Sequence, residues 1–216
     1  MEIEGIIFDL DGTLVNTIED IGDAANVMLK RKGLPLHTTD EYVKWIGNGA
    51  VKLIENALGP GVDPDQLMPC VTRFRELYSK NLHNKSRLYE GIPELLDELT
   101  SRGMKLSVLS NKPHPFTGQV ASFYLSGWDF YPVFGQRESV PLKPDPTAAL
   151  EIADILKIKR DKTLLVGDSL GDLKTAEAAG MIPVGVSWGY GRLGTIVQNG
   201  HCLIHDPMEL IKLLKR

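Results

Sequence analysis

Short apolar runs recur along the chain, and segments with helical periodicity separate most of them. The runs are rich in residues that favour strands, and they span Gly5–Leu10, Lys105–Leu109, Phe130–Phe134, Thr163–Val166, Pro183–Val186 and Cys202–Ile204. From the second run onward, the intervals contain predicted helices over Ile92–Arg102, Phe116–Leu125, Pro146–Leu156 and Asp172–Ala179. Strands that read as continuous apolar runs and alternate with helices predict a parallel sheet covered by helices on both faces.

The interval between the first two runs follows a different pattern. It shows only helical periodicity before Pro93, over roughly Thr17–Lys32, Thr39–Ile46, Ala50–Leu58 and Pro64–Leu82. Such a stretch is too long for an ordinary connection between neighbouring strands. We therefore expect residues 16–83 to form an α-helical cap domain inserted after the first strand. Residues 1–15 and 84–216 should form the core, an α/β fold of three layers with a Rossmann-like parallel sheet.

Composition narrows the classes of function. The 216-residue chain is 43% hydrophobic and 24% charged, which is ordinary for a folded soluble protein. Its net charge of −4 argues against nucleic acid as a partner, because nucleic-acid binders usually carry a clustered basic face. The sequence shows neither a signal-peptide pattern nor an apolar run of the roughly 20 residues that a membrane span needs. We expect a cytoplasmic monomer or homodimer with no membrane partner.

Two carboxylates follow the first strand, in the stretch "GIIFDLDGTLV". Burying a charge costs on the order of several kcal/mol unless the charge is paired or bound to a metal. A helix N-cap needs one acid, whereas this strand supplies Asp9 and Asp11, which pleating would place on the same side. A divalent cation would explain why both are tolerated.

More polar residues are expected at the same edge of the sheet, because ligands gather at the carboxyl ends of parallel strands. The candidates after or near these ends are Asp9, Asp11, Ser110, Asn111, Lys112, Lys143, Asp168, Ser169 and Asp172. Taken singly, most have a plainer interpretation. An aspartate after a strand often caps a helix, Ser-Asn is common in turns, and Lys143 suits a surface loop.

In combination, these residues resemble the motifs of a known family. "DLDGT", "SN", the lysine of "KPDP" and "GDSLGDL" are similar, in chain order, to the four motifs of the haloacid dehalogenase-like superfamily. The resemblance covers the whole chain, including the helical insertion. It implies a phosphatase in which Asp9 is the nucleophile that becomes an aspartyl-phosphate. Asp11 then protonates the leaving alcohol and later deprotonates the hydrolytic water.

The same resemblance implies how substrate and metal are held. Ser110, the Asn111 backbone and Lys143 would bind the phosphoryl oxygens of a small phosphorylated metabolite. Mg²⁺ would be the cofactor, because it suits a carboxylate-rich site that keeps some waters. Its implied ligands are Asp9, the carbonyl of Asp11 and Asp168, with Asp172 in a supporting role.

Asp11 and the cap indicate the branch of the superfamily. A departing halide needs no proton, whereas an alkoxide does, so Asp11 favours phosphoryl transfer over dehalogenation. The segments "GNGA", "SNKP" and "WGYG" resemble the phosphoglycolate phosphatase branch. Gly47, Asn48 and Gly49 are then a candidate anion site at a helix start, although a plain turn between helices explains them as well. A pyrophosphatase or a sugar-phosphate mutase of the same superfamily remains an alternative.

Two further motifs suggest other classes. "GDSLG" matches the nucleophile elbow of serine hydrolases, with Ser169 as nucleophile, and makes that class a remote alternative. No oxyanion segment of the usual kind accompanies it, and neither His201 nor His205 follows Asp206 as the usual order requires. "GYGRLG" matches a dinucleotide fingerprint but comes too late in the chain, so we interpret Gly189–Gly194 as a flexible loop near the active-site edge.

Overall fold

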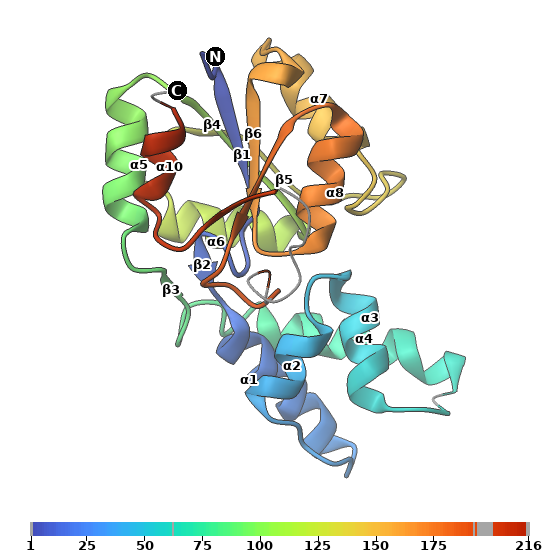
Figure 1. Cartoon of the computed structure of the whole chain (residues 1–216). Coiled ribbons are helices and arrows are strands. Elements are labelled where there is room, and N and C mark those ends of the chain that lie inside the picture. The colour runs from blue at the N-terminus through green and yellow to red at the C-terminus, as the bar shows by residue number, and fades with distance from the viewer. Residues whose placement is uncertain (1, 62, 192, 194–200, 215–216) are drawn as a thin grey trace.

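The six strands expected from the apolar runs form one parallel sheet (Figure 1). The computed structural model describes residues 2–61, 63–191, 193 and 201–214. The strands are β1 (Gly5–Phe8), β4 (Lys105–Pro113), β5 (Phe130–Gln136), β6 (Thr163–Gly167), β7 (Ile182–Val186) and β8 (Cys202–Ile204). Their order across the sheet is β5-β4-β1-β6-β7-β8.

Helices cover both faces of this sheet. On one side lie α5 (Ile92–Ser101), α6 (His114–Tyr124) and α10 (Glu209–Leu213), and on the other lie α7 (Thr147–Leu156) and α8 (Leu170–Ala179). Alternate residues of β1 serve the two faces. Ile6 and Phe8 join the core with α5, whereas Ile7 joins the core with α7 and α8. Both faces of the strand are buried, which explains its unbroken apolar run and confirms the three-layer α/β fold.

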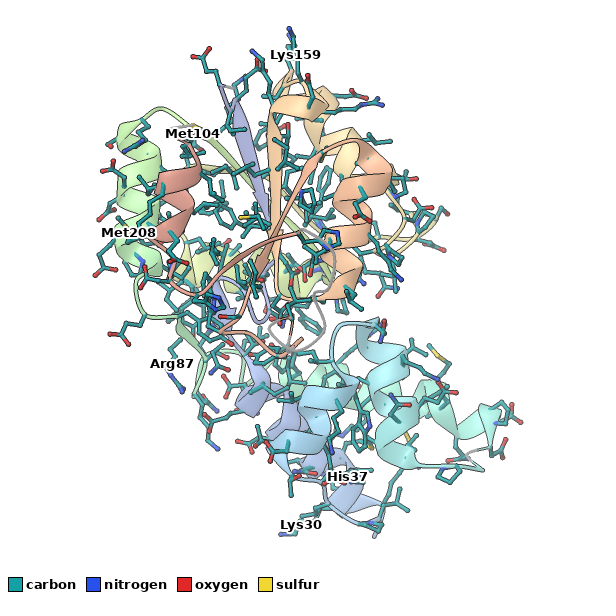
Figure 2. The ribbon with its side chains drawn as sticks, in the orientation of Figure 1. Lys30, His37, Arg87, Met104, Lys159 and Met208 are labelled. Atoms are coloured by element: carbon teal, nitrogen blue, oxygen red, sulfur yellow. The ribbon has the colours of Figure 1, made fainter. Side chains whose placement is uncertain are left out.

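Four helices form a separate cluster at one end of the sheet (Figure 1). They are α1 (Ile18–Arg31), α2 (Thr39–Trp45), α3 (Gly49–Leu58) and α4 (Pro64–Tyr78). One apolar stripe of α1, which includes Met28 and Leu29, is buried, as the helical periodicity of this segment requires. Figure 2 places Lys30 at the end of this cluster farthest from the sheet, and Lys159 at the opposite end of the molecule. The assignment of residues 16–83 as a cap domain remains a prediction.

The chain enters and leaves the helical cluster through a feature that the apolar pattern did not predict. Val15–Asn16 (β2) and Arg87–Leu88 (β3) pair as short antiparallel strands. The buried carboxylate of Asp20, in α1, accepts hydrogen bonds from the backbone nitrogens of Lys85 and Ser86 and from the Ser86 hydroxyl. These contacts bind the two connecting segments to each other.

No helix within the described residues combines the length and the apolar character that crossing a bilayer requires.

Candidate active site

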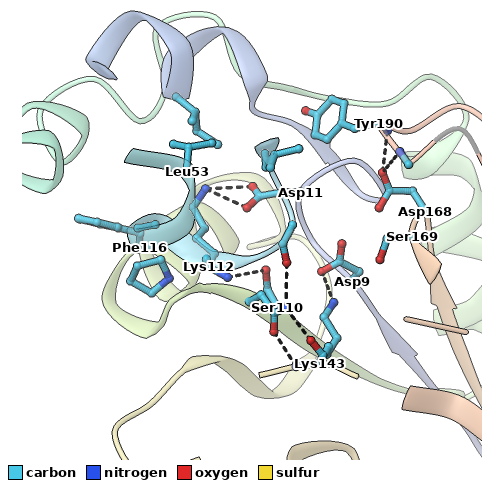
Figure 3. Close-up of a pocket in the computed structure, with 18 of the residues that line it drawn as sticks. Asp9, Asp11, Leu53, Ser110, Lys112, Phe116, Lys143, Asp168, Ser169 and Tyr190 are labelled. Carbon is cyan, nitrogen blue, oxygen red and sulfur yellow. Dashed lines mark hydrogen bonds and ion pairs between the residues drawn. The ribbon is translucent and has the colours of Figure 1, made fainter. Parts of the chain in front are cut away.

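A pocket lies where the carboxyl ends of β1, β4 and β6 meet the helical cluster (Figure 3). Chain order reverses at β1, because β4 and β5 lie on one side of it and β6 to β8 on the other. Open parallel sheets bind ligands at such a switch point. The pocket is lined by these expected residues: Asp9, Asp11, Gly47, Gly49, Ser110, Asn111, Lys143, Asp168 and Ser169.

Lys143 connects Asp9, which lines the pocket, with Asp172, which is buried and is not among the lining residues. Its Nζ lies 2.7 Å from Asp9 Oδ1 and 2.6 Å from Asp172 Oδ1, and it also donates to the Leu109 carbonyl at 3.0 Å. The Lys143 side chain is only 6% exposed. Burial at this depth makes a charged pair rigid and expensive to break, because removing one partner leaves the other charge uncompensated.

Asp168 is held by the loop that follows β7. Its Oδ2 accepts hydrogen bonds from the backbone nitrogens of Tyr190 at 2.6 Å and Gly191 at 3.1 Å. A Cβ atom at Gly189 or Gly191 would overlap Asp168, so glycine is required for this close approach. Of the predicted loop, Gly189–Gly191 does lie at the active-site edge, whereas Arg192 and Gly194 fall outside the described residues.

Burial makes two carboxyl groups of the pocket, those of Asp168 and Asp9, hard to ionise. It raises the pKa of Asp168 to about 7, repulsion from Asp172 adds to the shift, and the amides of Gly191 and Tyr190 oppose it. Burial likewise raises the pKa of Asp9 well above its usual range, against the attraction of Lys143. For Lys143, burial favours the neutral amine, but Asp172 and Asp9 outweigh it and raise the pKa of this amine above its ordinary value.

Three of these carboxylates have the arrangement of a metal site. Oxygen atoms of Asp9, Asp168 and Asp172 all lie within 4.8 Å of one another, and all three residues are buried. An all-oxygen, carboxylate-rich set suits a hard cation such as Mg²⁺. Such a cation would also compensate negative charge that burial otherwise penalises. The residues present therefore fit the expected metal.

Asp11 lies in the same pocket but has different partners (Figure 3). Its carboxylate accepts from Lys112 Nζ at 2.9 and 3.2 Å and from the Thr17 hydroxyl at 2.6 Å. Asp9 and Asp11 both line the pocket, but strand pleating is not the reason, because β1 ends at Phe8. The Asp11 side chain faces the helical cluster, and its carbonyl as a metal ligand remains a proposal.

Ser110 and Asn111 lie inside β4, which runs on to Pro113 through a shift in register rather than ending at Leu109 as expected. The Asn111 side chain donates to the carbonyls of Gly47 at 2.9 Å and Lys143 at 3.2 Å, and accepts from the Lys143 backbone nitrogen at 2.9 Å. It therefore joins the loop of Lys143 to the helical cluster. The Ser110 hydroxyl accepts from the Lys112 backbone nitrogen at 3.2 Å.

The turn of Gly47, Asn48 and Gly49 lies against the core at the start of α3. Gly47 and Gly49 line the pocket and have φ angles of +103° and +81°, in the region that favours glycine. The contact from Asn111 to the Gly47 carbonyl gives the turn a structural role. Its role as an anion site remains a prediction.

Ser169 does not have the surroundings of a hydrolase nucleophile. It is the N-cap of α8, and its hydroxyl donates to Asp172 Oδ2 at 2.5 Å. Within the described residues, the recorded side-chain partners of His201 and His205 are Glu177 and Ser187, so neither histidine serves Ser169 as a base. The geometry gives no support to the serine hydrolase alternative.

Three residues of the site were not singled out from the sequence. The sequence places Lys112 at this edge and Tyr190 in the loop near it without assigning either a role, and it gives no signal for Tyr78. Lys112 Nζ donates to the Tyr78 hydroxyl at 2.6 Å, across 34 positions of sequence. No local pattern reports a pairing at that separation, whereas the "WGYG" and "GYGRLG" segments both contain Tyr190.

The sequence and the fold of this chain are both similar to those of known proteins. A relative named phosphoglycolate phosphatase, from Nitrosospira multiformis, is 36% identical over all of this chain and 97% of its own length. A second of that name, from Nitrosococcus oceani, is 34% identical over 87% of this chain and 85% of its own. The crystal structure of a predicted phosphoglycolate phosphatase from Haemophilus somnus superposes with a TM-score of 0.87 at 26% identity, covering 99% of this chain and 98% of that one.

These relatives confirm the enzyme class that the motifs indicated, a phosphatase of the phosphoglycolate phosphatase-like branch. The sequence profile described as haloacid dehalogenase-like hydrolase matches residues 6–186. That match spans most of the chain, from the first strand to the end of β7, and contains the whole pocket apart from Tyr190 and Gly191. The chain therefore belongs to the haloacid dehalogenase-like hydrolase family.

Proposed function

We propose that this protein is a Mg²⁺-dependent phosphate monoester hydrolase that acts through an aspartyl-phosphate on Asp9, with phosphoglycolate as its substrate. The observation that carries the proposal is the placement of Asp9. Its Oδ1 is held by Lys143, and its Oδ2 has no hydrogen-bond donor among the described residues. An acid, Asp11, lines the same pocket only two positions away in sequence.

The metal would be held by Asp9 and Asp168, with Asp172 supporting and the Asp11 carbonyl as a further ligand. Mg²⁺ would supply positive charge to the phosphoryl oxygens, which carry charge in the transition state. Lys143, the Ser110 hydroxyl and the Asn111 backbone would bind the same oxygens. An anionic nucleophile can then approach an anionic ester without prohibitive repulsion.

In the first step, an Asp9 oxygen attacks phosphorus and the bond from phosphorus to the ester oxygen breaks. That oxygen leaves with the electron pair and receives the Asp11 proton, so an alcohol departs. In the second step, Asp11 takes a proton from water, whose oxygen attacks the same phosphorus. The bond to Asp9 breaks, inorganic phosphate is released, and both carboxyl groups return to their initial states.

The choice of phosphoglycolate is supported by the names of the relatives and by the small pocket under the helical cluster. A sugar-phosphate mutase would use the same aspartates but return the phosphoryl group to a second hydroxyl. A pyrophosphatase would release a phosphate as its leaving group. Small phosphorylated metabolites are thus the proposed partners; the cytoplasmic location and the oligomeric state remain predictions.

The test is a phosphate-release assay on the purified protein with Mg²⁺. The substrates are phosphoglycolate, pyrophosphate, a hexose phosphate and p-nitrophenyl phosphate, each with an EDTA control. We expect the highest kcat/KM for phosphoglycolate and no release in EDTA. Release from none of them would contradict the proposal, and preference for pyrophosphate or a hexose phosphate would move the protein to a neighbouring branch.

A further inference from the structure

The wall that the helical cluster contributes to the pocket is apolar except at one point, where Tyr78 contacts Lys112 of β4. Among described residues, the other side chains that line the pocket from the helical cluster are apolar: Ile21, Val43, Ile46, Ala50, Leu53 and Phe74. None of these side chains can form a hydrogen bond with a sugar hydroxyl. A leaving group with many hydroxyls would lose its hydrogen bonds to water there without replacement.

Lys112 brings a buried positive charge to this apolar wall. Its side chain is 4% exposed, and its Nζ contacts both Asp11 carboxylate oxygens and the Tyr78 hydroxyl. The ammonium group has three N–H donors, and two of them are directed at the single carboxylate of Asp11, so one of these two can turn to a further anion. Figure 3 shows the lysine reaching toward Asp11 beside Leu53 and Phe116.

The Tyr78 hydroxyl supplies a second donor at the same point. Tyr78 is buried in α4, and its oxygen accepts the Lys112 hydrogen bond. Tyr78 lines the pocket, and none of the described residues accepts a hydrogen bond from its hydroxyl group. A buried donor without an acceptor is unfavourable, and a ligand oxygen in the pocket would satisfy it.

We propose that Lys112 and Tyr78 together bind a carboxylate on the leaving group, and so select short carboxylate-bearing phosphate esters over sugar phosphates. The inference rests on the proposed function, because it takes Asp11 as the acid that meets the leaving oxygen. In a two-carbon leaving group of this class, the carboxylate carbon is bonded to the carbon that carries the leaving oxygen. The carboxylate therefore lies close to Asp11, where Lys112 and Tyr78 are found.

The experiment compares phosphoglycolate with 2-hydroxyethyl phosphate, which has the same two-carbon length and no charge on its leaving group. The variants are Tyr78→Phe and Lys112→Met, and Tyr42→Phe is the matched control. Tyr42 is also a buried tyrosine of the helical cluster, but its hydroxyl donates to Asn26 rather than to a pocket residue.

We expect the wild type to prefer phosphoglycolate, and both pocket variants to lose at least tenfold more kcat/KM on phosphoglycolate than on 2-hydroxyethyl phosphate. Tyr42→Phe should change kcat/KM by the same factor for both substrates. Equal losses in the pocket variants would overturn the inference, because Lys112 would then act only through Asp11. If Lys112→Met does not fold, the comparison of the two substrates with Tyr78→Phe is sufficient to test the inference.

A binding measurement separates this inference from the proposed function. In an Asp9→Asn background with Mg²⁺, calorimetry should show tighter binding of phosphoglycolate than of 2-hydroxyethyl phosphate, and Tyr78→Phe should remove most of that difference. Equal affinities for the two esters in the Asp9→Asn protein with Tyr78 intact would overturn the carboxylate site, even if the wild type hydrolyses phosphoglycolate. Absence of hydrolysis of every ester by the wild type would instead contradict the proposed function.

Discussion

The phenol oxygen of Tyr190 accepts a hydrogen bond from the backbone nitrogen of Thr17 at 2.7 Å. It also accepts from the Ile18 nitrogen at 3.1 Å and donates to the Asn16 side chain at 2.8 Å. The backbone nitrogen of the same tyrosine donates to Asp168. One residue of the loop after β7 thus contacts both the proposed metal site and the start of α1, where the chain enters the helical cluster.

Replacing Tyr190 with Phe should lower the free energy of unfolding by about 1–2 kcal/mol, because two amide donors at the start of α1 lose their acceptor. Urea denaturation measures the change. Tyr131→Phe is the control, since Tyr131 is 63% exposed and its loss of a hydroxyl should have little effect. Equal stability of the two variants would show that water replaces the Tyr190 hydroxyl at this helix start.

Replacing Asp9 with Asn should abolish turnover and leave the fold intact. The amide cannot form the proposed aspartyl-phosphate, while Lys143 keeps its contact with Asp172. Phosphate release measures the loss, and circular dichroism checks the fold. Beryllofluoride with Mg²⁺ should bind the wild type as a mimic of phosphorylated Asp9. If the variant keeps more than a few per cent of wild-type activity, Asp9 is not the nucleophile.

Replacing Asp168 with Ala should raise the Mg²⁺ requirement or abolish activity, because a proposed metal ligand is lost. EDTA should inactivate the wild type, and added Mg²⁺ should restore it. Ser169→Ala should retain much more activity and lower the free energy of unfolding by about 1 kcal/mol, because Ser169 caps α8. Titrations of activity against Mg²⁺ measure the first effect. The reverse ranking of the two variants would return attention to Ser169 as a nucleophile.

The stabilisation by Mg²⁺ should depend on pH. Without metal, burial raises the pKa of Asp168 from 3.8 to about 7, so the folded protein binds more protons than the unfolded chain between these values. Stability of the metal-free protein should therefore fall as pH rises through this window. Mg²⁺ needs the ionised carboxylate, so the ionisation of Asp168 alone should make its apparent affinity about tenfold weaker at pH 6 than at pH 8.

Thermal unfolding with and without Mg²⁺ at the two pH values measures this effect. The Mg²⁺-induced rise in Tm should be larger at pH 8 than at pH 6. Asp168→Asn, which cannot ionise, is the control and should show a smaller pH dependence than the wild type, since Asp9 still titrates. A Tm shift independent of pH in the wild type would mean that Asp168 does not control metal binding.

Replacing both Gly47 and Gly49 with Ala tests the turn as an anion site. Their positive φ angles strain any other residue, so the amides at the start of α3 should lose their geometry. We expect kcat/KM to fall markedly for phosphoglycolate and much less for p-nitrophenyl phosphate. Equal losses on the two substrates would assign the turn to shaping the cap, in line with its contact to Asn111.

Local features of the sequence predicted the six strands of the parallel sheet and most of the helices, but not the β2–β3 pair or α10. The unbroken apolar run of β1 reflects burial on both faces, and the stripe of α1 reflects burial on one. Both are patterns among near neighbours in the chain, so they can be read without knowledge of the rest. The end of β4 was misplaced, because polar residues such as Ser110 and Asn111 continue the strand where the apolar pattern stops.

The gathering of the candidate site residues also followed from the sequence. Asp9, Asp11 and Asp168 stand just after strands, and parallel strands bring their carboxyl ends to one edge. Side chains from that edge therefore had to lie close together once the strands were placed in one parallel sheet.

Only the tertiary structure decided which of these side chains are partners. Asp11 contacts Lys112, 101 positions away, while Asp9 contacts Lys143, 134 positions away. Tyr78 and Tyr190 enter the site from α4 and from the loop after β7. Periodicity reports which face of an element is buried, but a hydrogen bond needs two atoms within about 3 Å. That precision depends on how the helices pack over the end of the sheet, and no local pattern contains it.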